Sequence, residues 1–268
     1  MKKALLPLAT LFSLVVVFPI FYTLSGSFFA PSDFTDVPTR LFPSVLNLGN
    51  YAKAFAGSHL TRFLANSLAS ATFGTLFRMV ISILAAYAFS FFTFKGRDAL
   101  FVLVIATMLL PGDALLIENF KTIRHLGLLD TYLGIISTSL LAPVHIFMLR
   151  QYFKTISKEY QEAAILEGCT DFRFIVSLLL PLSKSVLIIL TLQSFTGIFN
   201  DYLWPLLVTN KESMRTVQVG ITMLGFSETL EFGPQFAAIS VLTSPIVLAF
   251  IMLRKKIQES VNTRFTGR

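Results

Sequence analysis

Long apolar stretches alternate with shorter polar segments along the whole chain. Six of these stretches approach the ~20 residues that a helix needs to cross the hydrocarbon core of a bilayer. A helix is the required state, because backbone groups in lipid must be hydrogen-bonded within the segment. The pattern therefore predicts an all-α, polytopic membrane protein with six transmembrane helices, near residues 4–25, 64–92, 99–117, 128–149, 185–208 and 236–253.

The composition supports a membrane protein. Of the 268 residues, 54% are hydrophobic and 14% are charged, with a mean hydropathy of +0.71. A soluble fold needs a charged surface, and this chain has too few charges to cover one. The net charge of +7 lies between the apolar stretches rather than on one face. We therefore expect a lipid bilayer and no nucleic acid as a partner.

The distribution of Lys and Arg predicts the orientation. With the N-terminus in the cytoplasm, the 22 basic residues divide into 14 in inner segments, seven in outer segments, and Arg78 within a span. The positive-inside rule therefore places both termini in the cytoplasm and residues 26–63 and 209–235 outside. The first apolar stretch exceeds the ~7–15 residues of a signal-peptide core and lacks a clean cleavage site, so we expect an uncleaved span.

The chain offers little for catalysis or metal binding. It has a single cysteine, Cys169, and three scattered histidines, with no Cys/His spacing suited to a metal. We expect no cofactor, no metal and no enzymatic activity. An intramembrane enzyme would need a nucleophile and base, or a metal cluster, within the spans.

The long inner segment at 150–184 is predicted to form two short helices joined by a turn. Ser157 can cap the first helix, and Gly168 supplies the turn that ends it. Thr170 can cap the second helix, and Pro181 marks the return to the membrane. The first helix has an apolar face, formed by Phe153, Ile156, Tyr160, Ala163 and Ala164. The residues leave two interpretations open, a helix lying on lipid headgroups or a surface that another protein approaches closely.

One pattern in this segment has a known counterpart. Its residues are Glu162-Ala163-Ala164, Gly168 and Leu178-Leu179-Leu180-Pro181. They resemble the EAA motif of ABC importer permeases, E-A-A-x3-G-x9-I-x-L-P, with leucine in place of the isoleucine. Glu167 stands where the family usually has aspartate, and it keeps the carboxylate.

The resemblance extends over nearly the whole chain. Its pattern is similar to that of the second permease of sugar and glycerol-3-phosphate importers, in the maltose-type branch. The runs that carry it are Asn66-Ser67, Ala85-Ala86-Tyr87-Ala88-Phe89, Met108-Leu109-Leu110-Pro111-Gly112, Leu126-Gly127-Leu128-Leu129-Asp130-Thr131-Tyr132 and Asn200-Asp201-Tyr202-Leu203-Trp204-Pro205.

The resemblance implies a type I ABC importer permease bundle (MetI-like) in a bacterial or archaeal cytoplasmic membrane. It implies one permease domain over residues 1–268, with its core at about 62–254 and a coupling loop at about 151–184. The implied partners are an ABC ATPase dimer, a second homologous permease and an extracytoplasmic solute-binding protein. The ATPase would contact Glu162, Ala163, Ala164, Gly168 and Pro181. This chain has no GxxxxGK[ST] loop, so a partner would bind the ATP.

Polar groups within the spans are candidates for the solute path, because charges are costly at membrane depth. We single out Arg78, Asp113, Asn200 and Asp201. The alternative is that these groups pair with one another and hold the bundle together. Arg78 would suit a phosphorylated solute, since the glycerol-3-phosphate branch tends to carry a basic residue near this point.

A secondary transporter or channel acting without an ATPase is the main alternative function. Such proteins often show inverted repeats with paired broken helices, and this sequence shows no such repeat. The cytoplasmic EAA pattern would also have no role in that case. The sequence therefore favours a permease that imports a carbohydrate or polyol, such as an oligosaccharide or glycerol-3-phosphate.

Overall fold

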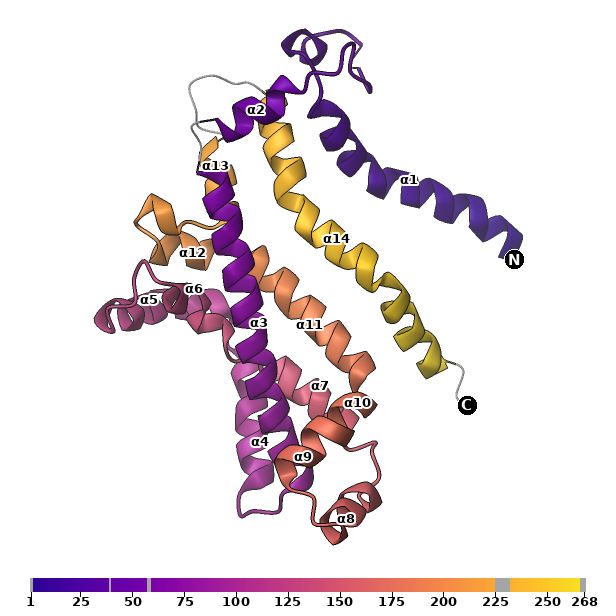
Figure 1. Ribbon diagram of the computed structural model, residues 1–268, viewed down its shortest axis with the longest axis vertical. Coiled ribbons are helices and arrows are strands. Elements are labelled where there is room, and N and C mark those ends of the chain that lie inside the picture. The colour runs from indigo at the N-terminus through magenta and orange to yellow at the C-terminus, as the bar shows by residue number, and fades with distance from the viewer. Residues whose placement is uncertain (1, 39, 57–58, 225–231, 266–268) are drawn as a thin grey trace.

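A computed structural model describes residues 2–38, 40–56, 59–224 and 232–265. These ranges contain helices and connecting turns, and they include no strand, as the sequence predicts (Figure 1). The α-helices are α1 Lys2–Gly26, α2 Gly49–Phe55, α3 Leu60–Phe91, α4 Arg97–Ala106, α5 Leu116–His125, α6 Tyr132–Ile136, α7 Pro143–Phe153, α8 Glu159–Leu166, α9 Asp171–Phe174, α10 Leu180–Leu182, α11 Lys184–Phe199, α12 Leu203–Val208, α13 Val217–Leu224 and α14 Phe232–Phe265. Shorter 3₁₀ turns are η1 Pro31–Phe34, η2 Thr107–Leu109, η3 Gly112–Leu115, η4 Ser137–Ser139 and η6 Glu212–Met214, and η5 Ile175–Leu179 is a π-helical turn.

Three helices in the described ranges, α1, α3 and α14, are long and apolar enough to cross a membrane. Two more candidate spans are bent pairs of helices. Tyr132–Ser139 and Pro143–Phe153 meet at 53°, and Asp171–Leu182 and Lys184–Phe199 meet at 87°. Five of the six predicted spans therefore have a helical counterpart, two of them bent.

The sixth predicted span, 99–117, is broken near Pro111, where the Pro111-Gly112 pair in the sequence predicts a break or kink. Helix α4 ends at Ala106, and Leu110 is extended, with ψ at 120°. The next residue is Pro111, which has no N–H to continue a helix and disfavours the helical state of the residue before it. The chain resumes in η3 and α5, and Figure 1 shows α5 running across the direction of α4.

Helix α3 is the centre of the fold and packs against α7 and α11. Small side chains on α3 permit this close approach. A Cβ added at Gly74 would lie 2.9 Å from Ile198 Cδ1 of α11 and 3.3 Å from Ile136 Cγ2 of α6. Small residues at helix contacts are the usual means of close packing in membranes, where lipid is as apolar as the helix surfaces.

The segments predicted on opposite sides of the membrane lie at opposite ends of α3. Figure 1 shows α2 at one end, and α8 with α9 at the other. After the predicted topology, we call these the outer end and the inner end. Helices α1 and α14 lie side by side, and both leave the outer end with their free termini pointing away from α2.

Candidate functional site

The inner segment after α7 folds as the sequence predicts around its turn. Gly168 has a φ of +72°, and its N–H donates to the Ile165 carbonyl at 2.9 Å. This left-handed conformation is the reason for glycine at the end of α8. Thr170 Oγ1 then accepts from the Arg173 N–H at 3.4 Å and caps α9. The prediction for Ser157 needs adjustment, because its hydroxyl accepts from the Glu159 N–H at 3.3 Å while Lys158 occupies the N-cap of α8.

The two alanines of the EAA pattern face different surroundings. Ala164 is half-buried and packs on the chain's own core, in a cluster with Phe153 and Phe174. Ala163 is exposed, as is Glu162. Of the two alanines, only Ala163 is therefore free for close approach by another molecule. The sequence predicted this role for both Ala163 and Ala164.

Large apolar side chains are exposed on α8 and α9, near Ala163 in the sequence, and of these the predicted apolar face included only Tyr160. Leu166 is 89% exposed and Phe172 is 74% exposed, with Tyr160 and Ile165 also exposed. Helices α8 and α9 are short, so a hydropathy average along the sequence mixes these apolar residues with their charged neighbours and hides them. An apolar surface of this kind outside the spans marks an interaction site.

Helix α9 is fixed to the inner end of α3. The Tyr87 hydroxyl on α3 donates to Asp171 Oδ1 on α9 at 2.6 Å. The buried Phe174 ring meets Phe91 edge-on, with ring centroids 5.7 Å apart. A displacement of the inner segment would therefore be passed to the central span through these contacts.

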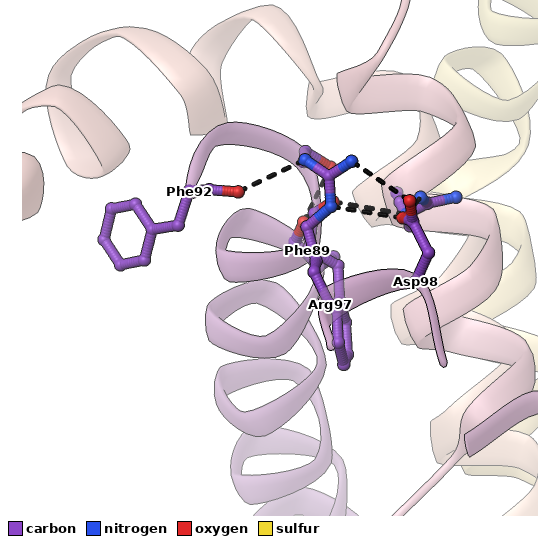
Figure 2. A network of polar contacts seen from close by, with 7 residues as sticks. Phe89, Phe92, Arg97 and Asp98 are labelled. Atoms are coloured by element: carbon purple, nitrogen blue, oxygen red, sulfur yellow. Dashed lines mark hydrogen bonds and ion pairs between the residues drawn. The ribbon is translucent and has the colours of Figure 1, made fainter. Parts of the chain in front are cut away.

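A second network at the inner end joins α3, α4 and α7 (Figure 2). The buried Arg150 guanidinium on α7 lies 3.8 Å from the centre of the Phe101 ring. It donates to the Phe89 carbonyl at 3.3 Å and to Asp98 Oδ1 at 3.4 Å. Arg97 also donates to Asp98, at 3.1 Å, and this hydrogen bond, together with the positive charges of Arg97 and Arg150, holds the pKa of the Asp98 carboxyl below its ordinary value. The network fixes the helix end from which the inner segment begins.

Pro181 lies within α10, and the chain turns at the following Ser183. The 87° bend separates Leu182 from Lys184. Pro181 stands in the first turn of α10, where its missing N–H is tolerated. The chain direction thus changes two residues beyond Pro181, the residue predicted to mark the return to the membrane.

A cavity of about 780 Å³ lies at the junction of the broken helices. Asn200 and Asp201, two of the four residues singled out in the sequence, both line it. The other polar lining residues are Thr107, Asn119, Thr138 and Tyr202, and apolar residues of α4, η2, α5 and α7 complete the wall.

The remaining two predicted path residues differ in position. Arg78 is not among the lining residues of this cavity, and its Nε donates to the Ser139 carbonyl. Its charge interacts with that of Asp201, so the alternative of pairing within the bundle is supported. Asp113 lies in η3 next to Gly112, which lines the cavity, but its side chain is outside the described part of the structure.

The structure adds a polar stripe on α11 that sequence reasoning missed. Gln193, Gly197 and Asn200 recur at helical spacing and are all exposed. Gln218 Nε2 on α13 donates to Asn200 Oδ1 at 3.1 Å. The spacing alone could have revealed the stripe. Trp204 is buried and donates to the Gly134 carbonyl at 2.9 Å, and it also lines the cavity.

The helices that can cross a membrane, including the two bent pairs, surround a partly polar cavity, and a helical segment projects from one end. This arrangement is typical of a membrane permease. The chain matches the family described as "Binding-protein-dependent transport system inner membrane component" over residues 78–261, and it belongs to that family. This places it in the inner membrane as a multi-pass permease of an ABC importer, and the family is one of transport permeases rather than enzymes.

Relatives with assigned roles match along almost their whole length. The chain is 34% identical to the sn-glycerol-3-phosphate transport system permease protein UgpE of Rhizobium meliloti (strain 1021), over 93% of this chain and 92% of the relative. It is 31% identical to the arabinooligosaccharides transport system permease protein AraQ of Bacillus subtilis (strain 168), over 91% and 88%.

A solved structure has the same fold. It is a chain of a bacterial ABC transporter involved in the import of the acidic polysaccharide alginate, with a TM-score of 0.87 at 23% identity, covering 95% of both chains. The predicted fold class and the predicted permease class are both confirmed.

Proposed function

We propose that this chain is one of two permease subunits in an ABC importer, and that the surface of α8 and α9 binds an ATPase subunit. The observation that carries the proposal is the exposed apolar surface around Ala163, on a segment fixed to the spans by the Tyr87–Asp171 contact. Burial of Leu166 and Phe172 against a partner would favour the complex. Glu162, Gly168 and Pro181 lie on the same segment and are exposed.

The other proposed partners follow from the same importer, in which an ATPase subunit binds α8 and α9. An ATPase dimer at the inner end would need a second permease, since one chain offers a single such surface in its described ranges. A solute-binding protein would deliver the solute at the outer end. The excess of Lys and Arg in inner segments supports cytoplasmic termini.

For the solute, we propose an uncharged carbohydrate or polyol. The described side chains that line the cavity include one carboxylate, Asp201, and no Lys, Arg or His. A bound phosphate would need cations or several N–H donors. Arg78, the residue predicted to meet a phosphate, donates to the Ser139 carbonyl and is not among the described residues that line the cavity. Glycerol-3-phosphate, the solute named for the first relative, is therefore less favoured here than an oligosaccharide.

The ATPase surface is tested by adding bulk at its centre. Ala163→Trp places a large side chain in a contact that needs close approach, and Gly168→Asp forces a side chain into a left-handed turn. Both variants should insert normally and retain less than a tenth of the wild-type ATPase on co-purification. Ala52→Trp, an exposed alanine of α2 at the outer end, is the matched control and should retain it fully. Wild-type co-purification and uptake in both inner variants would contradict the proposal.

A further inference from the structure

An apolar ridge lies outside the spans, in the outer segment between α1 and α2. We define the outer ridge as Leu41, Phe42, Val45, Leu46 and Leu48, whose side chains are 45 to 71% exposed. Five large apolar residues within eight positions form a contiguous patch in the sequence. Exposed patches of this kind mark an interaction with a membrane or a partner.

The outer ridge stands on a folded frame. The buried Asp33 carboxylate accepts from the backbone N–H of Ala30 at 2.9 Å and of Ser44 at 3.3 Å. The Asn50 side chain donates to the carbonyls of Ser27 and Phe29 at 2.9 and 2.8 Å. The buried polar side chains of Asp33 and Asn50 are thus hydrogen-bonded within the segment, while its large apolar side chains are exposed. The exposure of the ridge is therefore part of a folded structure.

The ridge continues the surface of α1. The Phe42 ring meets Phe21 of α1 edge-on, with ring centroids 5.5 Å apart. The Ser25 hydroxyl, near the end of α1, donates to the Leu41 carbonyl. No described residue of α1 from Pro7 to Leu24 is buried, so beyond the side that lies along α14 the chain leaves this surface to the surroundings. In Figure 1 the segment lies at the outer end of α1, where the helix would leave the hydrocarbon core.

We propose that the outer ridge inserts into the outer interface of the lipid bilayer and anchors the outer end of α1. Aromatic and apolar side chains at the end of a span favour the boundary between headgroups and acyl chains. The nearby charges fit this depth, because Arg40 Nε is paired with Asp36 at 2.6 Å and needs no further counter-ion. Continuity with the exposed surface of α1, a helix long and apolar enough to cross a membrane, favours lipid over a protein as the occupant.

The experiment uses nitroxide labels on the full chain in phosphatidylcholine nanodiscs, in a Cys169→Ala background. Leu46→Cys reports on the ridge. Leu14→Cys, on the exposed face of α1, is the lipid reference, and Val37→Cys, which is 97% exposed in the same outer segment, is the water reference. Collision with oxygen and with a nickel chelate is measured by electron paramagnetic resonance.

We expect the label at position 46 to have an oxygen-to-nickel ratio several-fold above that at position 37 and below that at position 14, which lies deeper along α1. A ratio equal to that at position 37 would mean that the ridge faces water, and it would overturn the proposal. Low collision rates with both reagents would mean that protein covers the ridge, through a second copy or another chain, and it would equally overturn lipid as the occupant.

Discussion

Asp33 shows how one buried side chain organises the outer segment. Its carboxylate is 1% exposed and receives hydrogen bonds from two backbone N–H groups. Hydrogen bonds from Ser44 and Ala30, with the nearby Arg40 charge, lower the pKa of the Asp33 carboxyl below its ordinary value of 3.8. Hydrogen bonding to the charged form of an acid has this effect.

The stability of the outer segment should therefore depend on pH in one direction. Because the folded pKa is lowered, the contribution of Asp33 is complete above the ordinary value of 3.8 and is lost as the pH falls through the lower folded value. Limited proteolysis of residues 30–48 should be constant from neutral pH down to this point and should rise below it. Asp33→Asn should raise proteolysis at neutral pH and remove most of the dependence. If proteolysis of the Asp33→Asn variant still rises at low pH as in the wild type, other carboxylates cause the rise.

At the scale of elements, the inner segment is tied to the central span by a few contacts. Tyr87 connects α3 to α9 through its hydroxyl, while its ring packs against Phe91 with centroids 5.2 Å apart. The ring contacts and the hydrogen bond can be separated by substitution. This makes the connection between spans and inner segment measurable.

Tyr87→Phe should loosen α9 without unfolding the spans. The variant keeps the ring contacts and removes one hydrogen bond to a partly solvated carboxylate, a loss of about 1 kcal/mol. Hydrogen exchange in α9 should quicken several-fold, and exchange in the middle of α3 should not change. A double-mutant cycle with Asp171→Ala isolates the pair, because the second change should add little once the hydroxyl is gone. Fully additive effects would show that the two residues act separately.

The elements also show what sequence reasoning could reach. Gly168 and Thr170 were predictable, because a left-handed turn and a helix cap are local and depend on the residue type itself. The break at Pro111 was predictable for the same reason, because proline has no N–H to continue a helix and disfavours the helical state of the residue before it. The position of Arg78 was not predictable, since its partner Ser139 is 61 residues away and only the packing of α3 on η4 brings them together.

At the scale of the whole molecule, charge inside the bundle is balanced between helices. Arg78 on α3 donates to Ser139 and interacts electrostatically with Asp201 after α11. Removal of one partner leaves the other charge uncompensated at membrane depth, which is the costly situation. The contact with Ser139 favours a role of Arg78 in assembly of the bundle, which is one of the two roles that the sequence leaves open.

Arg78→Ala should lower the yield of folded protein in detergent. The variant removes a charged hydrogen bond to the Ser139 carbonyl, and the expected loss of stability is about 2 kcal/mol. Arg78→Ala combined with Asp201→Asn should recover part of the yield, because the unpaired carboxylate is gone. Arg78→Lys keeps the charge but not the planar guanidinium, and it should be intermediate. Normal yield of Arg78→Ala together with lost uptake would instead place Arg78 on the solute path.

The break after α4 also has a consequence for water. Helix α4 has ten residues and rises ~15 Å, about half the thickness of the hydrocarbon core. The extended backbone at Leu110 and Pro111 follows at that depth, and non-helical backbone is tolerated there only where protein or water meets its polar groups. Leu110 and Gly112 line the cavity. The cavity should therefore be hydrated while empty, and an arriving solute would exchange its hydroxyl groups for water molecules already held there.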